Sequence, residues 1–289
     1  MRNPEKMDEC YGGWYILNGK PVLSDTFDNS LIYEGESVYE VLRLKQGVPV
    51  FFGDHISRLE TSADRSEKPI LRNRAMLRND VIKLSELIKR SEANLKIVFN
   101  YKKGLDNCLV YYIEPVYPSA DQYSNGVRGI LFRAERKNPA SKVINKDLRS
   151  EIYHKLILEN AYEALLVNRK NEITEGSRSN IFFIKGEALV TSPDEMVLGG
   201  ITRKHLLAIC SNKGIPVEYR SVNAGEIADY ESAIMTGTSP VVLPFSSIGD
   251  ISFDVNHPLI SMLREEYLKR AEASRLEFIN EKDPQTLDQ

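Results

Sequence analysis

The spacing of apolar residues in the first part of the chain predicts two hairpins, two helices and a further pair of strands. Residues 14–23 form two short strands around Asn18-Gly19, a pair that accepts the positive φ angles of a type I′ turn. Residues 37–44 and 48–52 are β-branched and aromatic, which predicts a second hairpin. Apolar residues recur at helical spacing in 53–65 and 78–92, where Asn79 or Asp80 is available as an N-cap. Residues 95–101 and 108–117 again have strand character.

The remainder of the chain mixes strands and helices, which predicts an α/β (α+β) fold in two domains. Strands are expected at 127–135, 164–167, 180–184, 188–191, 215–220 and in the segment entering 235–238, and helices at 146–161, 202–211 and 258–278. Residues 118–126 are polar and have no periodicity, which is typical of a linker. We therefore expect an N-terminal α/β domain over 1–118, an interdomain linker over 119–126 and a second domain over 127–289.

Composition and charge narrow the classes of function. The 38 Lys and Arg residues are scattered among 41 Asp and Glu residues, for a net charge of −3, which argues against a nucleic-acid partner. No run approaches the roughly 18 apolar residues that span a bilayer, so we expect no membrane partner and a cytoplasmic location. The three widely spaced cysteines and four histidines lack the spacing of a disulfide framework or a metal centre, and no metal is expected.

Four local patterns could carry chemistry. Residues 198–207 run from a glycine pair into an amphipathic helix with Thr202 in its first turn, which suits either a phosphate site or an ordinary turn capped by that threonine. Residues 236–240 place three hydroxyls around a glycine, an arrangement suited to an oxyanion. Arg58 lies on the polar side of a predicted helix and is either solvated or bound to an anion. Glu175 is expected in a turn between two strands, either as a loop charge or as a buried partner for a cationic heterocycle nitrogen.

The order of these motifs resembles the fold-type IV pyridoxal-phosphate enzymes, the class IV aminotransferase family. That family contains branched-chain aminotransferases, D-amino acid aminotransferases and aminodeoxychorismate lyase. The resemblance runs from about Tyr15 to Tyr267. It rests on Leu17-Asn-Gly-Lys20, Gly35-Glu-Ser-Val-Tyr-Glu-Val-Leu-Arg43, His55-Ile-Ser-Arg-Leu-Glu-Thr-Ser-Ala63, Thr174-Glu-Gly-Ser-Arg-Ser-Asn-Ile-Phe182, Leu198-Gly-Gly-Ile-Thr-Arg203 and Thr236-Gly-Thr-Ser-Pro240.

The resemblance implies a cofactor, pyridoxal 5′-phosphate, and a set of site residues. Arg58 is similar to the family's phosphate-binding arginine, and Glu175 to the acid that pairs with the pyridine nitrogen and keeps it protonated. The remaining cofactor-binding residues that the motifs imply are Ser179, Asn180, Ile201, Thr202 and Thr238, and the substrate-binding residues are Tyr39, Arg43 and Ser239.

Lys142 is identified as the catalytic lysine by its position relative to Glu175. The family's lysine lies about 32 to 34 residues before this acid, usually in a K-x-x-N segment, and Lys142-Val-Ile-Asn145 begins 33 residues before it. The resemblance implies that Lys142 forms a Schiff base with the cofactor and moves the proton at the substrate Cα. Lys146 lacks the downstream asparagine, and we expect it to be a solvated helix residue.

Departures from the family pattern concern substrate recognition. The family's usual arginine is replaced near Ser30, and the Arg-x-His pair of D-amino acid enzymes is absent from residues 96–104. Lys102, Lys103 and Arg178 are alternative partners for a substrate carboxylate, although each is also a plausible solvated loop charge.

Three hypotheses for function follow from the resemblance. The first is an aminotransferase that moves an amino group between an amino acid and a 2-oxo acid, with a branched-chain-like substrate favoured. The second is elimination of the aminodeoxychorismate lyase type, which yields pyruvate and an aromatic amine. The third is a binding protein without turnover. The resemblance also implies a smaller N-terminal α/β domain, a larger β-barrel-like C-terminal α/β domain with the cofactor between them, and a homodimer.

Overall fold

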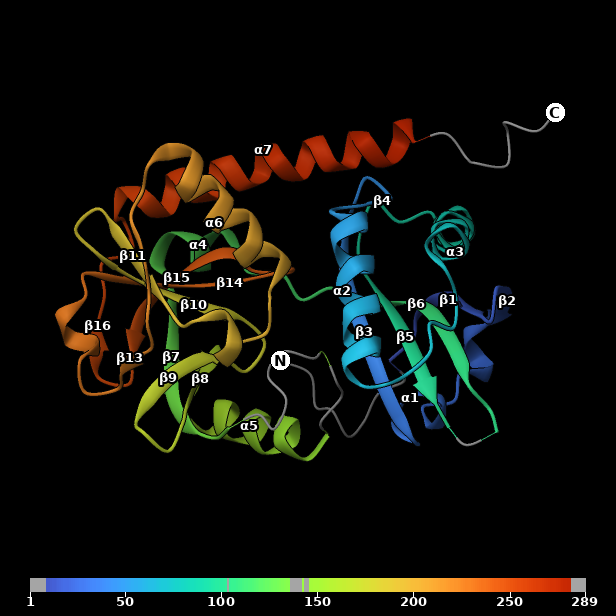
Figure 1. The fold of residues 1–289 in the computed structure, drawn as a ribbon, viewed down its shortest axis with the longest axis horizontal. Helices are drawn as coiled ribbons and strands as arrows, with labels where there is room; N and C mark the ends of the chain where they lie inside the picture. Colours follow the sequence, from blue (N-terminus) through green and yellow to red (C-terminus); the bar gives the residue numbers. More distant parts are fainter. Residues whose placement is uncertain (1–8, 103, 136–141, 143–145, 282–289) are drawn as a thin grey trace. The chain divides into compact units, whose positions relative to one another are not determined.

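The computed structural model describes residues 9–102, 104–135, 142 and 146–281. Among these residues the chain divides into two compact units, each built on one sheet. The six-stranded unit comprises residues up to 115, together with 142 and 271–281, and the ten-stranded unit comprises 116–135 and 146–270. Figure 1 shows the elements of both units along the chain.

The six-stranded unit has the strand order β2-β1-β6-β5-β3-β4, with every neighbouring pair antiparallel. Its strands are β1 (Tyr11–Leu17), β2 (Lys20–Leu23), β3 (Glu36–Lys45), β4 (Val48–Pro49), β5 (Glu92–Tyr101) and β6 (Asn107–Ile113). Its helices are the 3-10 turn η1 (Ser24–Thr26), α1 (Ser30–Tyr33), α2 (Phe52–Arg65) and α3 (Arg74–Ile88).

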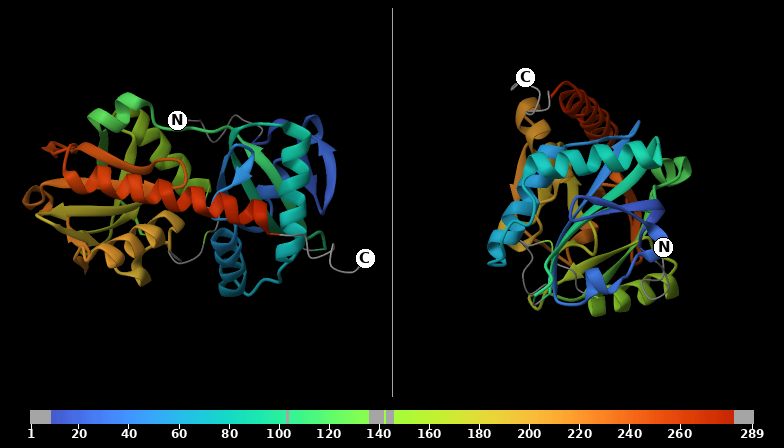
Figure 2. Two further views of the ribbon diagram at one scale, coloured as in Figure 1. Left: turned by 90° about the horizontal axis from the view of Figure 1, so that it is seen from above. Right: turned by 90° about the vertical axis from the view of Figure 1, so that its right-hand side faces the viewer.

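The two faces of this sheet are buried in different ways because side chains alternate along each strand. The even-numbered positions of β3, such as Leu42, pack under α2 and α3 in one core with Ile56 and Val81. Tyr39 faces the other way, into a smaller cluster that contains two further tyrosines and includes Ile32 of α1. Figure 2 shows α3, in teal, running along the sheet. Of the candidate site residues, Tyr39 lies on this second, aromatic face, whereas Arg58 is on α2 and pairs with Glu40.

The ten-stranded unit has a mixed sheet in the order β12-β11-β10-β14-β15-β7-β8-β9-β13, with β16 paired to β15. Its strands are β7 (Val127–Arg133), β8 (Glu163–Val167), β9 (Glu172–Gly176), β10 (Asn180–Lys185), β11 (Ala188–Thr191), β12 (Val217–Tyr219), β13 (Val222–Asn223), β14 (Ser232–Gly237), β15 (Val241–Ile248) and β16 (Ile251–Ser252). Its helices are α4 (Ala120–Asn125), α5 (Lys146–Leu158), η2 (Asp194–Met196), α6 (Ile201–Lys213), η3 (Ile227–Asp229) and most of α7 (Pro258–Asn280).

One core joins strands from both ends of this sheet order. Val190 of β11 and Val222 of β13 belong to the same buried cluster as Leu165, Met235 and Phe245 of the central strands. The sheet therefore curls around its core, as the expected barrel-like architecture requires. Helix α5 packs on the outer side of the curved sheet. Its Ile152 and Leu156 side chains contact β7 and β8.

Most predicted elements are present, and four differ for physical reasons. Asn18 and Gly19 have φ angles of 50° and 84°, which confirms the first turn. Helix α3 begins earlier than predicted, because Asn73 caps it by accepting a hydrogen bond from the Met76 N–H at 2.9 Å. Residues 120–125, expected within a linker, form α4 with a capping box on Ser119. Glu175 lies in strand β9 and not in a turn.

The fourth difference is at the C-terminal end of α7, which was expected in the second domain. Helix α7 belongs to the ten-stranded unit up to Arg270 and to the six-stranded unit from Ala271. The Phe278 ring packs on Phe52, with ring centroids 5.2 Å apart, and the Arg78 guanidinium lies 4.7 Å from the Phe278 centroid. This contact places the last turns of the helix in the core beneath α2 and α3.

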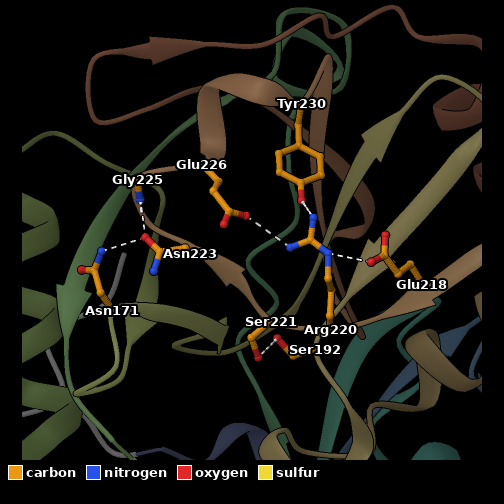
Figure 3. Close-up of polar contacts among 9 residues, drawn as sticks. All are labelled: Asn171, Ser192, Glu218, Arg220, Ser221, Asn223, Gly225, Glu226 and Tyr230. Carbon is orange, nitrogen blue, oxygen red and sulfur yellow. Dashed lines mark hydrogen bonds and ion pairs between the residues drawn. The ribbon is translucent and has the colours of Figure 1, made fainter.

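Arg220, between β12 and β13, binds β12 to the segment around η3. Its guanidinium donates to Glu218 at 2.7 Å, to Glu226 at 3.2 Å and to the Tyr230 hydroxyl at 2.6 Å (Figure 3). Asn223, two residues after Ser221, accepts from Asn171 and from the Gly225 N–H in the same view. All of these groups have protein partners, so the cluster is best explained as support for this corner of the sheet.

No helix in the described part of the chain is long and apolar enough to cross a membrane.

Candidate active site

In the ten-stranded unit, two predicted site residues hold the backbone just before the glycine pair. Glu175 is 3% exposed, and its Oε2 accepts a hydrogen bond from the Leu198 N–H at 3.0 Å. Asn180, on β10, donates from Nδ2 to the Leu198 carbonyl at 2.8 Å. Because one residue binds the N–H and the other the carbonyl of Leu198, the carboxylate of Glu175 and the entry to α6 are fixed relative to each other.

Gly200 is the N-cap of α6 and brings this backbone against Asn180. A Cβ atom at this position would lie 2.0 Å from the Asn180 Oδ1, so only glycine fits. Ile201 and Thr202 form the buried first turn, which contains no acidic side chain, and no side chain caps it. The first N–H groups of a helix have no partner within the helix, and its dipole is positive at this end. The turn is therefore suited to hold a phosphate.

The hydroxyl-rich turn that follows β14 lies beside the loop that follows Glu175. Strands β10 and β14 pair with Asn180 opposite Thr236, and a Cβ on Gly237 would lie 3.6 Å from the Arg178 carbonyl oxygen. Thr238 and Ser239 form the turn directly after β14. Three motifs that are far apart in the sequence are thus brought together in one unit.

Glu163 is a buried acid that the sequence reasoning did not assign to the site. Its side chain is completely buried, with Oε1 accepting from the Ser177 hydroxyl at 2.5 Å and the Ser177 N–H at 3.1 Å, and Oε2 from the Ser179 hydroxyl at 2.9 Å. These bonds fix the turn between Glu175 and Asn180. A charged residue at the start of the apolar run 164–167 is the signal that could have identified it.

In the six-stranded unit, Arg58 belongs to a buried group with Glu40 and His55. The Arg58 Nε and Nη2 donate to the two Glu40 carboxylate oxygens at 2.8 and 2.7 Å, and His55 Nδ1 lies 2.8 Å from Glu40 Oε2. Burial opposes ionisation of Glu40, but Arg58 and His55 outweigh it and lower its pKa to about 2. Burial lowers the pKa of His55, so a neutral imidazole is favoured. Glu40 thus fixes the orientation of the Arg58 guanidinium, a role that the sequence reasoning did not assign.

Lys142 lies beside Tyr39 of β3. The Tyr39 N–H donates to the Lys142 carbonyl at 3.1 Å, and the Lys142 Nζ lies 5.0 Å from the centroid of the Tyr39 ring. Arg58 also interacts electrostatically with Tyr39. Three predicted residues, Lys142, Tyr39 and Arg58, are therefore neighbours in this unit. Asn145, the other residue of the lysine motif, lies outside the described residues.

The other proposed substrate contacts have surface partners. Arg43 pairs with Glu92 at 3.2 Å, and Lys102 donates to Glu34 at 2.5 Å. Arg178 donates to the Tyr162 carbonyl at 3.0 Å, and the Ser30 hydroxyl donates to Asp28. Lys103 lies outside the described residues. The role of Arg43 in substrate binding stays a prediction.

The mixed α/β fold, with a helix N-terminus fixed beside a buried acid, suits an enzyme that uses a phosphorylated cofactor. The chain belongs to the class IV amino-transferase family, whose model matches residues 37–248. It is 28% identical to a D-alanine aminotransferase of Bacillus licheniformis over 225 residues, 74% of this chain and 79% of the relative.

Solved structures of the same fold include a putative branched-chain amino acid aminotransferase from Thermotoga maritima. That structure is 25% identical, with a TM-score of 0.79 over 92% of this chain and 97% of the other. A putative 4-amino-4-deoxychorismate lyase from Legionella pneumophila has a TM-score of 0.73 at 24% identity, over 82% of this chain and 91% of the other.

Family membership makes this chain a pyridoxal-phosphate-dependent enzyme. The residues present fit the cofactor, since the first turn of α6 suits its phosphate and the buried Glu175 suits its cationic ring nitrogen. When bound, pyridoxal phosphate supplies an electron sink for a carbanion at the substrate Cα.

Proposed function

We propose that the chain is an aminotransferase that moves an amino group between a neutral, branched-chain-like amino acid and a 2-oxo acid. The observation that carries the proposal is the Leu198 backbone, which is bound by both Glu175 and Asn180 immediately before the α6 turn. Because both residues bind Leu198, Glu175 and the first turn of α6 are held at a fixed separation. In the proposal, Glu175 faces the ring nitrogen of the cofactor and the turn faces its phosphate. The proposed phosphate donors are Ile201, Thr202 and Thr238, with Arg58 as fixed charge and Ser179 and Asn180 as supports.

Lys142 is the proposed catalytic base. Its amine would carry the cofactor at rest, and once displaced by substrate it would move the proton at the substrate Cα. The ring of Tyr39 borders the amine and would restrict its orientation. The positively charged Arg58 contributes to the electrostatic environment of the same tyrosine.

The aromatic and aliphatic cluster around Tyr39 supports a neutral substrate side chain. Tyr39 packs with Val98, Leu109 and Phe27 on the face of the sheet opposite α2 and α3. An aliphatic group packs against these apolar side chains without loss of hydration, whereas a charged group needs a polar partner there. Ser239 and Arg43 are the proposed partners of the polar end of the substrate.

The proposal is tested by single-turnover conversion of the cofactor-loaded enzyme. L- and D-forms of leucine, valine and alanine are added one at a time, without a 2-oxo acid, and the pyridoxamine phosphate formed is quantified by chromatography. We expect one equivalent per active site with leucine or valine. Release of pyruvate from aminodeoxychorismate without consumption of a 2-oxo acid would instead establish the lyase function, and no conversion of any amino acid would leave only a binding function.

We also propose a homodimer in the cytoplasm. In the described part of the chain none of the three cysteines forms a disulfide, which supports a reducing compartment. Sedimentation equilibrium of the purified protein tests the dimer directly.

A further inference from the structure

A buried lysine lies on the same face of the sheet as Tyr39 and is not used by the proposed reaction. Lys96 of β5 has a side chain only 3% exposed, in the middle of an apolar strand. Its Nζ lies 5.0 Å from the centroid of the Tyr39 ring, the same distance at which Lys142 approaches that ring. The two amines are therefore neighbours of one aromatic side chain.

Lys96 is one of three donors that converge on a single carboxylate. Glu9 accepts from the Lys96 Nζ at 2.5 Å and from the Tyr111 hydroxyl at 2.6 Å on Oε2, and from the Tyr33 hydroxyl at 2.8 Å on Oε1. The Glu9 side chain is 23% exposed, so it enters the cluster from its rim, whereas Lys96 lies at the base. Two phenols and an ammonium arranged in this way bind a carboxylate with charge-assisted hydrogen bonds.

The buried charge of Lys96 explains why position 9 needs an acidic residue. A buried ammonium without a counter-ion is costly, and the pairing removes that cost. Burial opposes ionisation of Glu9, yet Lys96 and the hydrogen bonds from Tyr111 and Tyr33 lower its pKa to about 2. Glu9 is therefore ionised throughout the physiological range.

We infer that Lys96, Tyr33 and Tyr111 form a carboxylate-binding subsite beside Tyr39, and that Glu9 fills it and so excludes amino acids with an acidic side chain. The inference rests on the proposed function, because it names the substrate class that the site refuses. Glu9 is tethered to the chain, so its effective concentration exceeds that of a free competitor. A substrate carboxylate reaches Lys96 only when the Glu9 side chain is absent.

Glu9→Ala empties the subsite, whereas Glu9→Gln removes the charge but retains the volume. Glutarate is titrated calorimetrically into the cofactor-loaded enzyme, and the rates of conversion of glutamate and norvaline are compared. In Glu9→Ala we expect glutarate to bind at least about tenfold more tightly than in the parent, and the glutamate to norvaline ratio of kcat/KM to rise about tenfold or more. Glu9→Gln should stay near the parent, and Glu9→Ala/Lys96→Met should lose both gains.

Glu60→Ala is the matched control, since Glu60 pairs with Arg74 at 3.1 Å on the surface of the same unit. Thermal unfolding with and without glutarate provides a second measurement if Glu9→Ala is poorly stable, and glutarate should raise its Tm more than that of the double variant. Equal glutarate affinity in Glu9→Ala and Glu60→Ala would overturn the inference. Tight glutarate binding without conversion of any amino acid would support the subsite and contradict the proposed function.

Discussion

At the scale of single residues, Gly200 occupies a position with no room for a methyl group. Gly200→Ala would place a Cβ against the Asn180 Oδ1, whereas Gly199→Ala meets no atom within 4 Å. We expect Gly200→Ala to displace Asn180 and the α6 turn at a cost of about 1–3 kcal/mol, and to weaken cofactor binding about tenfold or more. Titration of the apoenzymes of both variants with pyridoxal phosphate measures the change in cofactor affinity. Equal affinities in the two variants would contradict the assigned role of the turn.

Glu40 gives a prediction about the pH dependence of stability. The folded protein lowers its pKa from 4.5 to about 2, so its contribution is fully present above pH 4.5 and is lost as the pH falls towards 2. Glu40→Gln leaves the buried Arg58 without its counter-ion, and we expect a loss of about 3 kcal/mol at pH 7.

Denaturant unfolding of the parent and of Glu40→Gln at a series of pH values tests this prediction. The difference in the free energy of unfolding should shrink as the pH falls from 4.5 towards 2. A difference that stays constant over this range would show that Glu40 is not held ionised by Arg58.

The sequence identified individual site residues better than the tertiary contacts that those residues make. Glu175 and Asn180 were assigned from one short segment, whereas their shared contact with Leu198 depends on how β9, β10 and α6 meet. Glu9 and Lys96 are 87 residues apart, and neither carries a motif that links it to the other. Tertiary contacts of this kind have no signature in local periodicity.

At the scale of elements, the start of α3 gives a matched pair of substitutions. Asn73 caps the helix, whereas Asn79 and Asp80, the two caps expected from the sequence, lie within it. Asn73→Ala should lower the free energy of unfolding by about 1 kcal/mol because the Met76 N–H loses its acceptor. Asn79→Ala should leave it unchanged or slightly raised, since alanine is the better helix former. Thermal or urea unfolding distinguishes the two, and equal effects would place the cap elsewhere.

Strand β15 shows why some elements could not be predicted. Val241 begins it with a φ angle of 57°, and Pro244 interrupts an otherwise apolar run. Proline lacks an N–H and argues against an interior strand. The strand nevertheless pairs on both sides, antiparallel with β14 and parallel with β7, where the register shifts between Phe245 and Ser247. The pairing with β7 begins only at Phe245, after the proline, and local sequence patterns do not reveal these strand partners.

At the scale of the whole molecule, the division into two units follows packing and not chain order. The first change of unit is at Val116, and the end of α7 belongs with the N-terminal strands through Phe278. The proposed catalytic residues divide in the same way, with Lys142, Tyr39 and Arg58 in one unit and Glu175 and the α6 turn in the other. The account thus assigns proposed roles to residues of each unit.

The most direct test of that account is to locate the residue that binds the cofactor covalently. The loaded enzyme is reduced with borohydride, digested and mapped by mass spectrometry, with Lys142→Ala and Lys146→Ala treated alongside. We predict one reduced pyridoxyl group on Lys142 in the parent and in Lys146→Ala, none in Lys142→Ala, and a loss of turnover in Lys142→Ala of about 10³-fold or more. A pyridoxyl group on another lysine, or full turnover by Lys142→Ala, would contradict the account.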